Sequence, residues 1–280
     1  TFSKFGNLYW HVLAGNLTFP SQIAVRYKIP LIIWGVNGWS EQVGMFSHHD
    51  EVEMTDRCRL EHALFGLSLK KLIEVSNNTL NYRELNPFIY PSDEEIRNTG
   101  LRGIYLSNYF RWDSKKQHEK MINEYSYETN TQQRTFNNYE DVHCFHSAGI
   151  HDYLKYLKFG FGKITDHTSR EIRLKRLSRE QGIYLVNKYN NITDLEDTEV
   201  FINWLNIDMK DFTDVCDRFR NKSLWIKKNN EWILRDSINN YTNNENTEIA
   251  KLKQLEECNF MISNKILDES EKNYTLMGRT

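Results

Sequence analysis

The sequence predicts an α/β protein in which part of a parallel sheet is followed by a mainly helical region. The segment at 31–34 is a run of bulky apolar residues without polar alternation, which is typical of a strand buried on both faces of a parallel sheet. Residues 103–110 predict a second strand. Later in the chain, patterns such as Ser178-x-x-Gln181 mark the starts of successive helices.

A helix and a strand near the start form half of an α/β unit. Residues 19–27 predict a helix with Pro20 in its first turn, and the strand at 31–34 follows directly. A parallel sheet requires more such units than residues 1–85 supply. We therefore expect 1–85 to be the C-terminal part of an α/β domain whose other units precede Thr1.

The strand at 31–34 runs into a glycine-rich turn that could hold a ligand. Gly35-Val36-Asn37-Gly38 can turn tightly and let a ligand approach the backbone, and Glu41 follows with a polar side chain. Ligands of open α/β sheets bind beyond the carboxyl ends of the strands. A plain connecting loop explains the same residues, so both interpretations stay open.

The rest of the chain predicts a mixed and then helical substrate region at 86–220, and a hairpin, an Asn-rich linker and a terminal helix at 221–280. The expected elements are a helical pattern at 46–74, a helix started by Ser92, helices at 114–125 and 151–158, a glycine hinge at 159–162, helices started by Thr168 and Ser178, a helical pair at 198–205 and 209–220 with Asp208 as cap, and a hairpin turn at Asn229-Asn230.

Composition excludes several classes of protein. The 280 residues are 39% hydrophobic and 26% charged with a net charge of −2, which indicates a globular protein without a nucleic-acid or membrane partner. The four cysteines form no C-x-x-C pair, which disfavours a disulfide framework and a cysteine zinc site. We therefore expect a cytoplasmic protein.

The densest polar constellation lies at 141–179. Its imidazole, thiol and carboxylate groups would suit a metal ion, but their spacing matches no zinc pattern, so we expect none. The residues are His143, Cys144, His146, His151, Asp152, Asp166 and His167. The segment at 48–51 is likewise interpreted as a polar loop.

An anion site is another interpretation of the same region. Arg170, Arg173 and Arg176 recur every three residues along one expected helix, and arginine pairs bidentately with phosphate or carboxylate. A solvated basic helix face explains this pattern equally well.

The helices between 168 and 220 also fit a helix-turn-helix DNA-binding motif, but four aspartates on the last of these helices would repel the DNA phosphates.

Seven strings of sequence are long enough to be specific. They are I-P-L-I-I-W-G at 29–35, G-M-F-S-H-H-D-E-V-E-M-T at 44–55, Y-P-S-D-E-E-I at 90–96, G-L-R-G-I-Y-L-S-N-Y-F-R-W-D-S-K-K-Q-H at 100–118, Q-Q-R-T-F at 132–136, H-D-Y-L-K-Y-L-K-F-G-F-G-K-I-T-D-H at 151–167 and R-E-I-R-L-K-R-L-S-R-E at 170–180. Taken together, residues 5–235 resemble the N-acetyl sugar amidotransferase family, which includes pseudaminic acid biosynthesis enzymes and related lipopolysaccharide amidotransferases.

The resemblance implies an ATP pyrophosphatase (PP-loop) fold of the adenine nucleotide hydrolase type. It implies an enzyme of surface glycan biosynthesis that uses ATP and Mg²⁺ to convert an acetamido group of a nucleotide-linked sugar to an acetamidino group. The amide oxygen is adenylated and ammonia displaces AMP, which requires N–H groups and cations around the phosphate. No Cys-His-Glu glutaminase triad is recognisable, so we expect ammonia from a separate glutaminase subunit.

Site residues follow from the resemblance together with the polar patterns. We expect Gly35, Asn37 and Glu41 to contact the nucleotide. The expected catalytic residues are His151, Lys158, Asp166 and His167, and the expected contacts to the sugar or its anionic groups are Asn108, Arg111, Asp113, Arg170 and Arg173.

Two departures from the family pattern modify these expectations. The S-G-G-x-D-S loop and an N-terminal cysteine cluster would precede Thr1, so we expect the chain to be inactive alone. Val36 stands where the family has Glu, so Glu41 must compensate or the activity is weakened. The alternatives are another PP-loop enzyme that modifies tRNA, with salt-dependent RNA binding, or a non-catalytic helical interaction module that no nucleotide stabilises.

Overall fold

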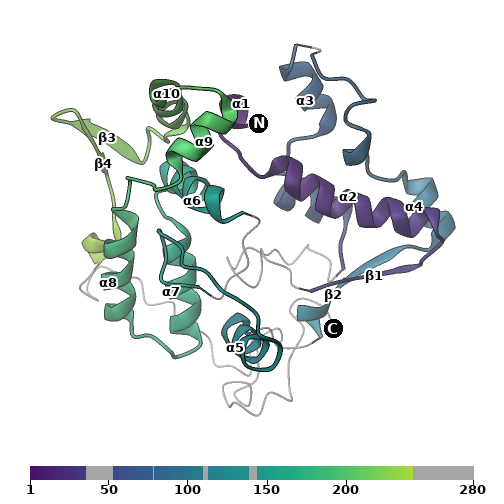
Figure 1. Cartoon of the computed structure of the whole chain (residues 1–280), viewed down its shortest axis with the longest axis horizontal. Helices are drawn as coiled ribbons and strands as arrows, with labels where there is room; N and C mark the ends of the chain where they lie inside the picture. The colour runs from purple at the N-terminus through teal and green to yellow at the C-terminus, as the bar shows by residue number, and fades with distance from the viewer. Residues whose placement is uncertain (36–52, 78, 110–112, 139–143, 242–280) are drawn as a thin grey trace. The chain divides into compact units, whose positions relative to one another are not determined.

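The computed structural model describes residues 1–35, 53–77, 79–109, 113–138 and 144–241 (Figure 1). The described residues divide into two compact units. We call the unit of residues 9–109 the sheet unit, and the unit of residues 1–8 and 113–241 the helical unit. None of the helices in the described ranges is both long and apolar enough to cross a membrane.

The sheet unit contains the predicted pair of parallel strands. Strand β1 (Leu31–Trp34) pairs with β2 (Arg102–Tyr105) in parallel, and Glu53 adds an antiparallel bridge to Ile104. The second strand is shorter than predicted because the chain turns into a 3₁₀ helix, η4 (Leu106–Asn108). Parallel pairing fits the predicted α/β class.

The prediction that the first strand is buried on both faces is wrong. Leu31 and Ile33 are 44% and 60% exposed. Their neighbours Ile32 and Trp34 lie on the opposite face, which lines a cavity together with Ser21. Among the described residues, helices therefore cover one face of this sheet only.

Helix α2 (Trp10–Arg26) begins nine residues before the predicted start at 19. Pro20 consequently lies inside the helix and not in its first turn, where it lacks the N–H for one backbone bond. Packing outweighs this cost, because Trp10, Ala14 and other residues at a spacing of three or four are buried along one side. The Trp10 Nε1 also donates to the carbonyl of Leu67 at 2.9 Å.

The remaining elements of the sheet unit are short. They are the π-helix η2 (Cys58–Ala63), α3 (Leu69–Val75), the 3₁₀ helix η3 (Asn86–Phe88) and α4 (Asp93–Thr99). The predicted cap at Ser92 is confirmed, since Ser92 and Glu95 exchange the two bonds of a capping box. The predicted helical pattern at 46–74 is broken by a turn at Phe65 and Gly66, which both have positive φ, and its first part lies outside the described residues.

The helical unit packs short helices around the middle of α6. Its elements are α1 (Phe2–Phe5), α5 (Ser114–Tyr125), α6 (Phe145–Phe159), α7 (Lys163–Arg173), α8 (Arg179–Asn190), α9 (Thr198–Leu205), α10 (Met209–Phe219), the antiparallel hairpin of β3 (Trp225–Lys228) and β4 (Glu231–Leu234), and the 3₁₀ helix η5 (Ile238–Tyr241). Ile150, Leu154 and Leu157 of α6 are at most 2% exposed and form the core with Ile164 of α7. In Figure 1, α7 and α8 lie side by side.

Local signals predicted most helix starts in this unit. Ser178 and Gln181 form the predicted capping box, and Asp208 caps α10 by accepting from the Asp211 N–H at 2.7 Å. Asn229 and Asn230 have φ values of 48° and 70° at the hairpin turn, as predicted.

Two predicted helix starts are wrong. The helix expected at Thr168 begins at Lys163, and Thr168 lies inside it with its hydroxyl donating to the Ile164 carbonyl. Since a mid-helix threonine can bond back to its own helix, the capping pattern there was coincidental. Helix α6 begins at Phe145, ahead of the predicted start at 151.

Candidate functional site

The candidate site is a group of buried polar residues in the helical unit. It consists of Arg134 and Thr135 from the loop before α6, Asp152 of α6, and Lys163 and His167 of α7. We call these five residues the polar centre. All but Lys163 are at most 4% exposed, so their polar groups have lost water and depend on protein partners.

Arg134 and Asp152 form a fully buried ion pair. The Arg134 Nε donates to Asp152 Oδ2 at 2.8 Å, and each side chain is 2% exposed. One terminal nitrogen, Nη1, donates to the carbonyls of Asn190 and Ile192. The other terminal nitrogen, Nη2, is inaccessible to solvent and has no hydrogen-bond acceptor among the described residues.

Asp152 also fixes the start of α7. Its Oδ1 accepts from the backbone N–H of Lys163 at 2.5 Å, which satisfies one of the unpaired donors at the helix N-terminus. Gly162 permits this approach, because a Cβ at that position would lie 2.9 Å from Asp152 Oδ2. The predicted glycine hinge therefore has a specific role in bringing backbone against a buried carboxylate.

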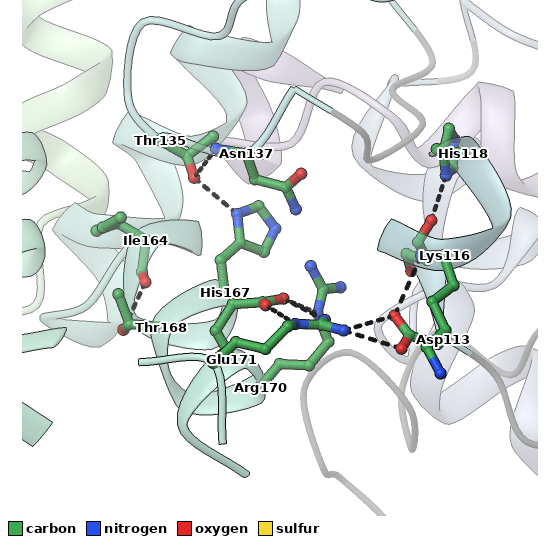
Figure 2. A network of polar contacts seen from close by, with 12 residues as sticks. Asp113, Lys116, His118, Thr135, Asn137, Ile164, His167, Thr168, Arg170 and Glu171 are labelled. Carbon is green, nitrogen blue, oxygen red and sulfur yellow. Dashed lines mark hydrogen bonds and ion pairs between the residues drawn. The ribbon is translucent and has the colours of Figure 1, made fainter. Parts of the chain in front are cut away.

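His167 is a neutral side chain in this environment. Its Nδ1 shares a hydrogen bond of 2.7 Å with Thr135 Oγ1 (Figure 2). Burial, and then the positive charges of Arg170, Lys163 and Lys155, hold the pKa of His167 well below its usual 6.5. His167 does not line the cavity beside this group, and its catalytic role stays a prediction.

Two of the three arginines predicted as an anion site, Arg170 and Arg176, contact carboxylates. Arg176 donates to both Asp113 oxygens at 3.0 and 2.9 Å and to Glu171. Arg170 also contacts Glu171 (Figure 2). Arg176 lies beyond α7, which ends at Arg173. The expected row of three arginines on one helix is therefore not formed, and the predicted sugar ligand Asp113 joins α5 to the segment after α7.

Asp166 lies beside the polar centre in an ion pair with Lys155. Burial raises the pKa of Asp166, while the positive charge of Lys155 opposes this shift. Lys155 Nζ also lies 4.9 Å from the centre of the Phe161 ring. These contacts place Asp166 near the charges that act on His167.

A cavity of about 270 Å³ opens on the polar centre. Arg134, Thr135, Asp152 and Lys163 line one part of it, and Asp197, which is bonded to His146 at 2.8 Å, lines another. The buried Arg134 with its unused Nη2 therefore belongs to the wall of a cavity.

Lys158 contacts a different part of the helical unit. Its Nζ donates to the carbonyl of Gly6 at 2.6 Å and to that of Phe5 at 3.3 Å, and it lies 5.4 Å from the centre of the Phe219 ring. Burial lowers the pKa of Lys158. This lysine thus holds the C-terminal end of α1, and a structural role accounts for all these contacts.

The other predicted residues are dispersed. His151 is half-buried on α6, and Arg173 is exposed at the end of α7. In the sheet unit, Gly35 accepts from the Ser107 N–H at 3.0 Å, so the carboxyl ends of β1 and β2 lie together with Asn108 one residue on. Asn37, Glu41 and Arg111 lie outside the described residues, and their roles stay predictions.

In the described ranges, no group of three or more His, Cys, Asp and Glu side chains could hold a metal ion. The described cysteines, Cys58, Cys144 and Cys216, form no disulfide bond with one another. The expectation of Mg²⁺ as cofactor stays a prediction.

Sequence reasoning did not select Arg134 and Thr135 as site residues. Both lie in the string at 132–136 that contributed to the family resemblance, in a loop without periodicity. Their importance arises from contacts to Asp152 and His167, which are 18 and 32 residues away. A charged residue in a short loop carries no sequence signal of burial.

The match to a known family falls within the helical unit. No curated protein matches the chain. Residues 133–239 match a family model described as LPS biosynthesis protein WbpG-like, C-terminal domain. This range contains the whole polar centre, and the similarity supports a role in lipopolysaccharide biosynthesis.

Proposed function

We propose that this chain forms part of a cytoplasmic, ATP-dependent enzyme of lipopolysaccharide biosynthesis that exchanges the oxygen of a sugar acetamido group for nitrogen. The match at 133–239 supports the biosynthetic role, and the resemblance of the longer sequence supports the chemistry. One observation carries the choice of site: a cavity is lined by the buried Arg134–Asp152 ion pair together with Thr135 and Lys163.

The polar centre offers groups that suit an acetamido sugar. The Arg134 charge is already balanced by Asp152, so this wall of the cavity suits a neutral group such as an amide or a hydroxyl. Thr135 and Lys163 line the same cavity and add a hydroxyl and a positive charge. In a nucleotide-linked sugar, the charge of Lys163 would favour the diphosphate.

ATP is proposed to bind in the sheet unit. Gly35 follows the carboxyl end of β1 and is bonded to Ser107 at the end of β2, which is where ligands bind in open α/β sheets. Asn37 and Glu41 are proposed to complete this contact together with Mg²⁺. ATP supplies the adenylation that makes the amide oxygen a leaving group, and ammonia from a glutaminase partner provides the nitrogen.

The test uses the protein at its natural full length. It is incubated with ATP, Mg²⁺, ammonia and a panel of nucleotide-linked acetamido sugars, and mass spectrometry follows the oxygen-to-NH exchange alongside AMP release. Arg134→Lys keeps a positive charge but removes the guanidinium, with its bonds to the Asn190 and Ile192 carbonyls. We expect it to abolish sugar-dependent AMP release while the circular dichroism spectrum is retained.

The matched control is Arg220→Lys. Arg220 is 8% exposed and pairs with Asp217. It does not line the cavity of the polar centre, so this variant should keep full turnover. Equal turnover in the two variants would exclude the polar centre as the sugar site. AMP release without a sugar product would indicate that the enzyme modifies RNA instead of a sugar. Absence of both ATP binding and turnover would favour the alternative that the chain is a non-catalytic interaction module.

A further inference from the structure

A separate cavity of about 240 Å³ lies entirely within the sheet unit. Its wall is built by the start of α2, the π-helix η2, the start of α3 and the end of η3. The proposed sugar and nucleotide sites use other residues. The rings, the backbone conformation and the charge of this wall indicate the chemistry of a ligand.

The wall of this cavity is mainly apolar. Three aromatic rings and three leucines line it: Trp10, Phe88, Tyr90, Leu60, Leu64 and Leu69. The Trp10 Nε1 already donates to the carbonyl of Leu67 at 2.9 Å, and the Tyr90 hydroxyl accepts from Ser21 at 3.3 Å. Because these polar atoms are engaged, both rings contribute apolar surface. The cavity exceeds the roughly 150 Å³ that holds benzene in an engineered apolar cavity.

The wall also includes a rare backbone conformation. In η2 the Leu64 N–H donates to the Arg59 carbonyl, five residues earlier, at 3.0 Å, so this turn is wider than that of an α-helix. Such π-helices are found frequently at functional sites. Leu60, Phe88 and Tyr90 are half-buried, so their side chains retain surface that a ligand can contact.

The charge at the cavity favours an anionic group. Arg59 and Lys70 are its only charged lining residues in the described part of the chain. The Arg59 guanidinium lies 4.2 Å from the centre of the Tyr90 ring and pairs with Asp56, which balances its charge. Lys70 is exposed and has no ion-pair partner among the described residues. A carboxylate is the complementary group for this lysine, whose flexible stem can follow the ligand.

We propose that this cavity binds a small aromatic carboxylate, whose ring packs on the apolar wall and whose carboxylate pairs with Lys70. Aromatic rings pack favourably on one another, which favours a ring over an aliphatic chain. The proposal goes beyond the proposed enzymatic activity and does not depend on it. Neither ATP nor a sugar takes part, so its failure would leave the proposed function untouched.

The test compares three probes that separate the ring from the charge. Phenylacetate carries both, phenylacetamide has no charge, and acetate has no ring. Titrations of the intact ¹⁵N-labelled chain, followed by NMR, give each dissociation constant. We expect phenylacetate to bind saturably and phenylacetamide to bind about three- to fivefold more weakly, as for an exposed ion pair. Acetate should bind at least about tenfold more weakly, because it buries no ring.

Two lysine variants test the position of the carboxylate. Lys70→Gln removes the charge at the cavity and should weaken phenylacetate binding about three- to fivefold, while phenylacetamide binding stays the same. Lys71→Gln is the matched control, since Lys71 is also exposed and does not line the cavity. Both dissociation constants should be unchanged in this control.

A third variant tests the position of the ring. Leu69→Trp enlarges a side chain of the wall and should abolish saturable binding of both aromatic probes. Circular dichroism reports whether this variant folds. If it does not, Phe88→Leu replaces it, because it removes one ring from the wall and should weaken both aromatic probes to the same extent.

The remaining outcomes overturn the proposal. Absence of saturable phenylacetate binding would show that the cavity takes no such ligand. Equal binding of phenylacetate and phenylacetamide, or equal effects of Lys70→Gln and Lys71→Gln, would show that Lys70 does not recognise the carboxylate. Unchanged binding in the folded ring variant would place the probe elsewhere on the chain.

Discussion

Asp152→Ala is expected to destabilise the helical unit strongly. Asp152 and Arg134 are each 2% exposed, so the variant leaves the Arg134 charge in the interior without its carboxylate. It also removes the acceptor for the Lys163 N–H at the start of α7. Removal of one partner from a buried pair costs about 3–5 kcal/mol. At roughly 2–4 °C per kcal/mol, the Tm should fall by about 6–20 °C.

Thermal melting followed by circular dichroism measures this effect. Asp214→Ala is the control, because the Lys210–Asp214 pair is 81% and 57% exposed and its loss should leave the Tm unchanged within error. The double variant Arg134→Met with Asp152→Leu should recover part of the lost stability, since no buried charge remains. A Tm for Asp152→Ala within roughly 2 °C of the unaltered protein would refute the reasoning, because it corresponds to less than about 1 kcal/mol.

Three further predictions concern the helical unit. His167 stays neutral when folded, so the unfolded chain binds one more proton below pH 6.5, and the free energy of unfolding should fall with acidification by up to about 1.4 kcal/mol per pH unit. In urea titrations between pH 7 and 5, His167→Gln should show a shallower fall than the unaltered protein. An unchanged slope would mean that His167 does not cause the pH dependence. Gly162→Ala places a Cβ 2.9 Å from Asp152 Oδ2 and should cost about 1–3 kcal/mol. Gly149→Ala adds a Cβ that meets no atom nearer than 3.7 Å and should stabilise α6 by roughly 0.5–1 kcal/mol. Urea unfolding measures both variants, and a Gly149→Ala variant less stable than Gly162→Ala would contradict the packing argument. Lys158→Met removes the hydrogen bonds to the carbonyls of Phe5 and Gly6 at the end of α1. Amide exchange and proteolysis at residues 1–8 should become faster, while amide exchange in α8 should be unaffected. Unchanged protection of residues 1–8 would exclude this anchoring role.

The sequence predicted the candidate region better than the individual site residues. Asp166, His167 and Arg170 were chosen from 141–179, and the structure places them in or beside one buried polar network. Lys158 lies on α6 in the same stretch of sequence, yet its Nζ contacts the end of α1. Adjacent residues on a helix point in different directions, so closeness in sequence does not place side chains in one site.

The exposed face of β1 shows the same limit for the fold. A run of four apolar residues indicates a strand, and β1 is one, paired in parallel as expected. The run does not report what covers each face, and Ile33 is 60% exposed. Pro20 gives a second example, since burial along a whole helix face outweighed a local preference for the first turn.

Interactions within a few residues were determined by the sequence itself. The caps at Ser92, Ser178 and Asp208 and the turn at Asn229-Asn230 depend on side chains and backbone three or four positions apart, so their patterns could be identified directly. Tertiary structure alone decided the polar centre. The bonds of Arg134 to Asp152, Thr135 to His167 and Arg176 to Asp113 join residues 18, 32 and 63 positions apart. A buried charge must be paired, and only the packed chain determines which distant segment supplies the partner.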